Sequence, residues 1–221
     1  MFCRFLVFIK FFLALTLCTA CGNNASLLSM QTNTEATEPG LDIVKLRTKA
    51  KEAKLFCEVQ KLSTSICLLI DYSIHSGKNR MVVWDFKTDT IAHTALVSHG
   101  CGDQPWGKDR SKTEPVFSNV NNSHCSSLGK YKIGARGYSQ WGIKVNYLMH
   151  GLEATNSNAL KREIVFHSWE AIADEEVYPD GTPEGWGCPA VSNRFMTMVD
   201  SLLKAQEDPD LMWGFTNYPP A

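Results

Sequence analysis

Residues 185–190 are the most informative stretch of the chain, and they read Gly185-Trp186-Gly187-Cys188-Pro189-Ala190. Glycines on both sides of Trp186 permit a tight turn and a close approach of the backbone to another group. Pro189 disfavours helical backbone at Cys188 and favours an extended conformation. The stretch leaves two interpretations open: a cysteine presented on a constrained loop for reaction, or a buried structural cysteine in a turn.

The segment after this stretch predicts a helix over about residues 193–204, with Ser192 as a candidate N-cap. Cys188 is therefore expected near a helix N-terminus. The helix dipole and the free N–H groups at such a position favour a thiolate over a thiol.

A nucleophilic cysteine also needs a base, and His167 is the candidate. It ends the apolar run Ile164-Val165-Phe166, which is typical of a buried strand, so its ring would lie at a strand end. The carbonyl of Ser168 is the nearest group that could orient the ring. A purely structural histidine is the alternative.

Other candidate site residues lie in the long polar loop of residues 99–127 and beside the cysteine. His99 opens that loop, His124 and Ser127 lie at its far end, and all three could line a substrate groove or be plain loop residues. Trp186, between loop glycines, is expected to form a wall of the groove. A zinc site made of His99, His167 and Cys188 is a further alternative, although the chain has no H-E-x-x-H motif to support it.

The remaining pattern predicts a mainly β fold with one or two helices in a single domain. Runs rich in β-branched and aromatic residues predict strands at 66–72, 80–86, 90–98, 131–133, 143–149, 163–167 and 211–215. The first three are expected to form a meander. A helix is expected within residues 41–63, and its apolar face would carry Leu41, Val44, Leu55, Val59 and Leu62.

Composition narrows the class of protein. The chain is 44% hydrophobic and 20% charged, which excludes wholesale disorder. Its formal net charge of -1 gives no basic excess, so nucleic acid is not expected as a partner. The chain also has no G-x-S-x-G elbow, P-loop or G-x-G-x-x-G motif.

The first 40 residues predict export rather than a folded element. Residues 1–20 have a basic start, an apolar stretch and a small-residue exit, which is typical of a signal peptide. Cys21 follows Leu17-Cys18-Thr19-Ala20, similar to a bacterial lipobox, so we expect lipidation of Cys21 and a polar tether over residues 21–40. Simple cleavage after Ala20 is the alternative. A redox or zinc role for Cys18 and Cys21 is a weaker one.

Export makes disulfides chemically plausible for the cysteines beyond Cys21. Proximity in sequence suggests the pairs Cys57–Cys67 and Cys101–Cys125, although four cysteines allow three connectivities. This arrangement leaves Cys188 as the free thiol.

Taken in order, residues 64–217 resemble the murein L,D-transpeptidase catalytic domain of the YkuD type, in its exported branch with a W-G-C-P-A signature. The segments that carry the resemblance are Leu69-Ile70-Asp71-Tyr72-Ser73, Val97-Ser98-His99-Gly100, Phe117-Ser118-Asn119, Ser126-Ser127-Leu128-Gly129, Gly151-Leu152-Glu153, Ile164-Val165-Phe166-His167 and Trp186-Gly187-Cys188-Pro189-Ala190.

The resemblance implies a β-sandwich catalytic domain at residues 64–221 that needs no cofactor. It also implies that Cys188 is the nucleophile, that His167 is its base and that the carbonyl of Ser168 orients the imidazole. The N–H groups of Gly187 and Cys188 would form an oxyanion hole. The implied partners are peptidoglycan stem peptides, the implied reaction is formation of 3-3 crosslinks, with L,D-carboxypeptidase activity toward water, and the implied location is the cell envelope or periplasm.

Two departures from the family pattern stand next to the signature. The family commonly has Arg-Ser before Trp-Gly-Cys, whereas this chain has Glu184 and Gly185. Glu184 would repel a substrate carboxylate that an arginine would hold. The rival interpretation is therefore a non-catalytic peptidoglycan-binding lipoprotein with a decayed site.

Overall fold

The computed structural model describes residues 40–107, 112 and 114–217. The chain divides into two compact units, residues 1–36 and 37–221, and only the second contains described residues. The expected signal peptide, Cys21 and all but the last residue of the tether lie outside the described residues. Within the described part of the chain, no helix is long and apolar enough to span a membrane.

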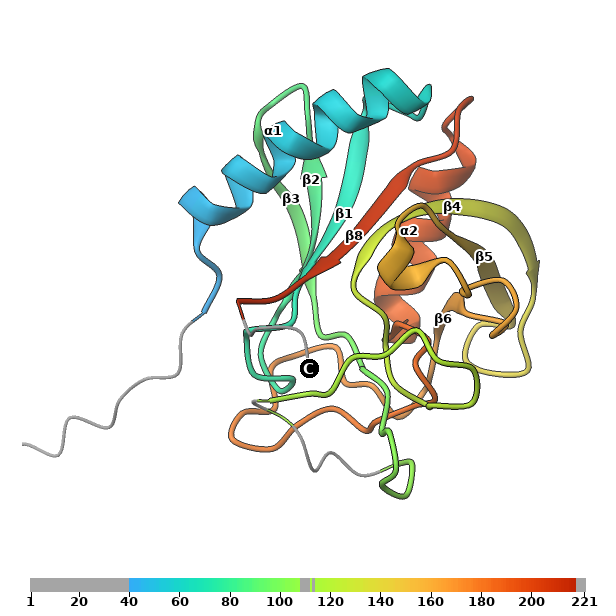
Figure 1. Ribbon diagram of the computed structural model, residues 1–221. Helices are drawn as coiled ribbons and strands as arrows, with labels where there is room; N and C mark the ends of the chain where they lie inside the picture. Colours follow the sequence, from blue (N-terminus) through green and yellow to red (C-terminus); the bar gives the residue numbers. More distant parts are fainter. Residues whose placement is uncertain (1–39, 108–111, 113, 218–221) are drawn as a thin grey trace, which may run out of the picture. The chain divides into compact units, whose positions relative to one another are not determined.

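One eight-stranded sheet organises the folded unit, in the order β3-β2-β1-β8-β4-β5-β6-β7 (Figure 1). The strands are β1 (Ile66–Asp71), β2 (Met81–Asp85), β3 (Thr90–Ala95), β4 (Gly129–Tyr138), β5 (Val145–Gly151), β6 (Val165–Ser168), β7 (Ala190–Val191) and β8 (Leu211–Phe215). The sheet curves into a near-barrel. The fold class predicted from the sequence, mainly β with one or two helices, is confirmed, and the α-helices are two.

The strand pairing agrees with the expected meander at one end of the sheet. β1 pairs antiparallel with β2, and β2 with β3, whereas β8 returns to lie parallel to β1 and antiparallel to β4. β8 is thus the strand that joins the meander to the rest of the sheet. The β4 strand is longer than the sequence predicted, and β7 and the 3-10 turn η1 (Ala154–Asn156) were not predicted at all.

Helix α2 (Asn193–Lys204) packs into the main hydrophobic core through Phe195, Met196, Val199 and Leu203. Ser192 caps it as predicted, because its side chain accepts a hydrogen bond from the Phe195 N–H at 3.2 Å. The same core holds one face of β1 and β2 together with side chains from β4, β5 and β6. This helix therefore packs against β6, the strand that carries His167.

Helix α1 (Ile43–Gln60) covers the other face of β1, β2 and β8, where a second core contains Leu69, Trp84 and Trp213 (Figure 1). The predicted apolar face of this helix was wrong at Val44, Leu55 and Val59, whereas Leu41 and Leu62, just outside the helix, do pack in the second core. The buried residues of the helix are Leu46, Ala50, Ala53 and Cys57, whereas Val44, Leu55 and Val59 are exposed, Val59 by 77%. Small side chains at three of the four buried positions let the helix lie close to the sheet.

The expected disulfides are absent from the described residues. Cys57, Cys67, Cys101, Cys125 and Cys188 are all free. Burial raises the pKa of Cys57 to about 12 and that of Cys67 well above its ordinary value. Both therefore act as small apolar side chains in the second core.

Candidate active site

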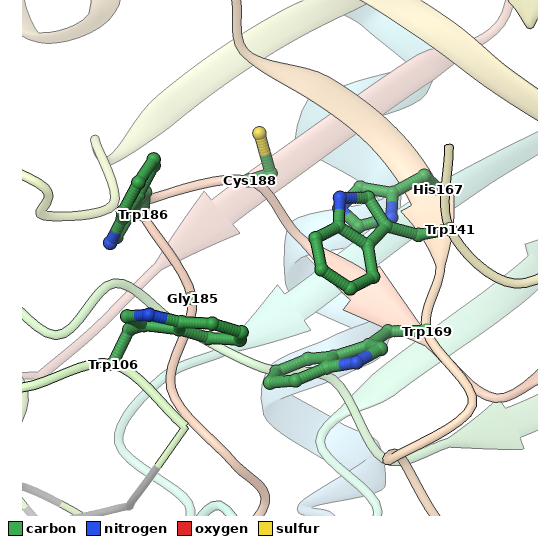
Figure 2. Close-up of a pocket in the computed structure, with 7 residues that line it drawn as sticks. All are labelled: Trp106, Trp141, His167, Trp169, Gly185, Trp186 and Cys188. Carbon is green, nitrogen blue, oxygen red and sulfur yellow. The ribbon is translucent and has the colours of Figure 1, made fainter. Parts of the chain in front are cut away.

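A cavity of about 230 Å³ lies beside the end of β6, and the candidate nucleophile and the candidate base both line it (Figure 2). Its lining residues are Trp106, Trp141, His167, Trp169, Gly185, Trp186 and Cys188. They come from the long loop, the β4–β5 turn, the end of β6 and the segment before β7. Four of the seven are tryptophans, so the cavity is largely apolar.

Sheet pairing places Cys188 and His167 on adjacent backbone segments. β6 and β7 are parallel, with His167 opposite Ala190 and Ser168 opposite Val191. Cys188 lies two residues before Ala190, and its sulfur accepts a hydrogen bond from the Val165 N–H at 3.4 Å. The side chains of Cys188 and His167 line the same cavity (Figure 2).

The His167 ring is oriented by the carbonyl of Ser168, 2.9 Å from its Nδ1. Because a carbonyl only accepts, Nδ1 carries the ring hydrogen and Nε2 is left with a lone pair. Burial lowers the pKa of His167, although the Ser168 carbonyl and the charge of Glu170 oppose this effect. The ring is therefore neutral at pH 7 and able to accept a proton.

Cys188 sits partly buried, with its thiol turned toward the main chain of the segment before β6. Its sulfur lies 3.9 Å from the carbonyl of Glu163, in addition to the Val165 N–H. Burial raises the pKa of this thiol, while the Val165 N–H and the charge of Arg162 act to lower it. The expected stabilisation of a thiolate by a helix N-terminus was wrong, because β7 and Ser192 separate Cys188 from the start of α2.

Gly187 meets a backbone requirement that only glycine fulfils easily. Its φ is +99°, and a Cβ at this position would lie 2.4 Å from the Cys125 carbonyl oxygen. The Gly187 carbonyl in turn accepts a hydrogen bond from the Ser126 hydroxyl at 3.2 Å. The loop at residues 118–127 thus supports the backbone immediately before the cysteine.

Arg162 ties that loop to the β6 strand, and the sequence analysis did not identify it. Its guanidinium donates to the carbonyls of Ser118 and Cys125 and to the hydroxyls of Ser127 and Ser123. It is also the cation that acts on the Cys188 thiol. No sequence motif around Arg162 indicated this role, because its partners are carbonyls and hydroxyls of a loop that is distant in sequence.

The comparison with protein families decides the class of this domain. A model of the L,D-transpeptidase catalytic domain matches residues 37–208. The chain belongs to the L,D-transpeptidase catalytic domain family. Membership supports a function related to peptidoglycan.

Two solved structures are similar to the chain. The L,D-transpeptidase from Xylanimonas cellulosilytica DSM 15894 shares 12% identity at a TM-score of 0.40, over 68% of this chain and 60% of that one. The helical cell shape determining protein Pgp2 from Campylobacter jejuni shares 9% identity at a TM-score of 0.40, over 71% and 49%. The chain spans about half to three fifths of the solved chains it matches. No curated protein matches it.

Within this L,D-transpeptidase domain, Glu184 does not have the position that its sequence suggested. The side chain is fully buried, and its Oε1 lies 3.1 Å from Nε2 of His99. Glu184 therefore faces away from the cavity and is not placed to repel a substrate carboxylate. Gly185 does line the cavity, and a Cβ there would meet nothing within 4 Å, so the missing serine leaves this wall open.

His99 is also fully buried, which contradicts its expected place on the surface of a substrate groove. Its Nδ1 lies 2.8 Å from Nη2 of Arg80, which can only donate, so Nε2 carries the hydrogen and donates to Glu184. Burial lowers the pKa of His99 to about 4. The hydrogen bonds that link Arg80, His99 and Glu184 hold the segment before Trp186 in place.

The other expected groove residues divide between surface and interior. Trp186 is 61% exposed and lines the cavity, and the His124 ring stacks on it with 5.2 Å between ring centroids. Ser127 is buried instead, and its hydroxyl donates to the Ser118 carbonyl and accepts from Arg162. Ser127 therefore supports the loop rather than the surface of the cavity.

Three cavity tryptophans were missed in the sequence: Trp106, Trp141 and Trp169. The signal available was that Trp106 and Trp141 stand in polar turns, where large aromatic side chains are unusual. The zinc alternative finds no support in the described residues, where no three His, Cys, Asp or Glu side chains are arranged to hold a metal ion.

Proposed function

We propose that the chain is a cysteine acyl-transferase that acts on peptidoglycan stem peptides and forms 3-3 crosslinks, with L,D-carboxypeptidase activity when water replaces the acceptor amine. The observation that carries the proposal is the His167 ring in the cavity beside Cys188, held by the Ser168 carbonyl with Nε2 left as the acceptor of a proton. Membership of the L,D-transpeptidase family supports the reaction class.

In the first step, His167 Nε2 takes the proton of the Cys188 thiol. The sulfur attacks the carbonyl carbon that precedes the terminal D-residue of a tetrapeptide. The C–N bond then breaks, and the departing amine receives the proton from the imidazolium. The N–H groups of Gly187 and Cys188 would stabilise the negative oxygen of the tetrahedral intermediate.

In the second step, the amine of a neighbouring stem attacks the thioester carbonyl. His167 accepts a proton from that amine, the C–S bond breaks, and the sulfur regains a proton. Water in place of the amine gives a shortened stem peptide instead of a crosslink.

The resting pair is a neutral thiol and a neutral imidazole, because burial raises the pKa of Cys188 and lowers that of His167. The thiol must exchange its main-chain contacts at Val165 and Glu163 for a contact with the imidazole before the proton moves. The thiol is therefore deprotonated by His167 as it attacks and is not ionised beforehand.

The proposed place of action is the cell envelope, with lipid on Cys21 and residues 21–40 as a tether to the membrane. The support for this part of the proposal is the composition of residues 1–40.

Substitution of Cys188 tests the proposal directly. Cys188→Ala should abolish crosslinked and shortened muropeptides, and His167→Gln should lower their rate of formation by at least about a hundredfold. Cys101→Ala, at a cysteine outside the cavity, is the matched control and should retain activity. Full activity of Cys188→Ala would contradict the proposal. A wild-type protein that is inactive but sediments with peptidoglycan would favour the alternative, a non-catalytic peptidoglycan-binding lipoprotein.

A further inference from the structure

The four cavity tryptophans form a box rather than a stack. Trp106 contacts each of the other three, with ring centroids 6.4 Å from Trp186, 6.1 Å from Trp141 and 5.6 Å from Trp169. Its plane makes an angle of 70° with Trp186 and 68° with Trp141. Figure 2 shows Trp106 and Trp169 along one side of the cavity, Trp186 and Trp141 on its flanks, and Cys188 on the remaining side.

This geometry suits a small cation. The four indole rings surround one cavity, and the centroid of Trp106 lies 5.6 to 6.4 Å from the centroids of the other three. An aromatic face attracts an ammonium group within ~6 Å of its centroid. Indole has the strongest such attraction among the aromatic side chains.

The box supplies no carboxylate counter-ion for such a cation. Among the described residues that line the cavity, none is acidic. The Glu184 side chain is buried on the far side of the segment, against His99. The Glu170 side chain, whose charge acts on His167, is exposed and accepts from the Gly142 N–H at 3.0 Å.

A carboxylate in the box would keep a bound amine protonated and unreactive. Indole faces attract the cation without the full counter-charge of a carboxylate, so they hold the proton on the amine less strongly than a carboxylate would. The His167 ring, with an unprotonated Nε2, lines the same cavity and can receive the proton.

We propose that Trp106, Trp141, Trp169 and Trp186 form an aromatic cage that binds the primary ammonium group of the acceptor beside Cys188. The identity of the bound group as the acceptor rests on the proposed function. The binding of a cation by the cage does not, and it can be tested separately.

The test measures protection of Cys188 from alkylation by iodoacetamide at about pH 8, where butylamine is almost entirely protonated. The two probes are butylammonium and butan-1-ol, which have similar size but differ in charge. Butylammonium should give half-protection at a concentration at least about fivefold lower than butan-1-ol. Equal protection by both would overturn the proposal, because it would show a merely apolar pocket.

Variants at Trp106 identify the source of the preference. Trp106→Leu keeps an apolar side chain without an aromatic face and should abolish the preference for butylammonium, whereas Trp106→Phe should keep part of it. Trp106 is 49% exposed, and thermal unfolding will verify that both variants fold. Tyr178→Leu, outside the cavity, is the control and should leave the preference unchanged. A preference that survives Trp106→Leu would contradict the cage.

The two proposals fail separately. If butylammonium is preferred and muropeptides are not crosslinked, the cage stands and the transferase does not. If muropeptides are crosslinked and both probes protect equally, the transferase stands and the cage does not.

Discussion

Chemistry at the scale of single residues depends on which protons His167 and Cys188 hold at rest. The Ser168 carbonyl fixes the hydrogen of the His167 ring on Nδ1, and burial keeps that ring neutral. Burial likewise favours the protonated Cys188 thiol. The two groups therefore rest as a neutral thiol and a neutral imidazole, and proton transfer from sulfur to Nε2 is uphill. The nearby positive charge of Arg162 lowers the pKa of the thiol and so reduces this cost.

Arg162 gives a prediction at this scale. Arg162→Gln removes the charge near Cys188 and leaves the carbonyls of Ser118 and Cys125 without their donor, so the pKa of the thiol should rise further and the protein should lose about 2 kcal/mol of stability. Arg162→Lys keeps the charge but not the forked geometry of the guanidinium. Compared with Arg162→Gln, it should therefore bring the pKa of the Cys188 thiol closer to the wild-type value than the stability of the protein.

The pH profile of Cys188 alkylation and urea unfolding measure these two effects. Identical alkylation profiles for wild type, Arg162→Gln and Arg162→Lys would contradict the electrostatic role of Arg162.

At this scale, the sequence could predict the residues whose role is local. The glycines and the proline beside Cys188 in the sequence constrain its backbone. Ser168 directly follows His167, whose ring its carbonyl orients. The sequence could not predict that His99 and Ser127 are buried, because their burial depends on Arg80 and Arg162 from distant segments. Trp106, Trp141 and Trp169 were missed because they reach the cavity from three segments that are far apart in sequence.

At the scale of elements, α2 and α1 show what periodicity can and cannot predict. The ends of α2 were predicted because Ser192 caps the helix and large apolar residues mark its buried face. The buried face of α1 was not predicted, because Ala50, Ala53 and Cys57 carry little of the hydrophobic signal by which a face is recognised.

Asp200 on α2 gives the prediction for this scale. Burial acts to raise the pKa of Asp200, but hydrogen bonds from Arg136, Tyr147 and Lys204 hold it at about 2, below the ordinary value of 3.8. Ionised Asp200 therefore stabilises the fold above pH 3.8, and this contribution is lost as the pH falls toward about 2.

Asp200→Asn should accordingly cost about 1–3 kcal/mol near neutral pH and progressively less as the pH falls below about 4. Urea unfolding of wild type and variant across this range measures the difference. A penalty that does not change with pH would show that the charge of Asp200 is not what holds α2 against β4 and β5.

At the scale of the whole molecule, β8 joins the two parts of the sheet, because it pairs with β1 on one side and β4 on the other. The mainly β class could be predicted from short runs rich in β-branched and aromatic residues. The parallel pairing of β1 with β8 could not, because it joins segments far apart in sequence and no local pattern specifies such a partner.

Asp210, directly before β8, makes global stability depend on pH. It is almost fully buried, and burial raises the pKa of its carboxyl to about 7, although a hydrogen bond from Ser63 opposes the shift. A carboxyl whose pKa is raised on folding stabilises the fold below its unfolded pKa, and that stability is lost as the pH rises through about 7.

Asp210→Asn should therefore be more stable than wild type by about 1–3 kcal/mol above pH 7, and the difference should shrink toward pH 4. Urea unfolding at about pH 5 and about pH 8 measures it. A variant that is less stable than wild type at the higher pH would contradict the burial of an uncompensated charge at this position.

Intact-protein mass spectrometry, followed by peptide mapping, tests the central claim that Cys188 forms an acyl-enzyme. The protein is incubated with a carbapenem and, separately, with purified muropeptides. The account predicts a covalent adduct on the peptide that contains Cys188, its absence in Cys188→Ala, and dimeric muropeptide product. A folded protein with a free Cys188 thiol that forms no adduct with either reagent, or forms one on another cysteine, would contradict it.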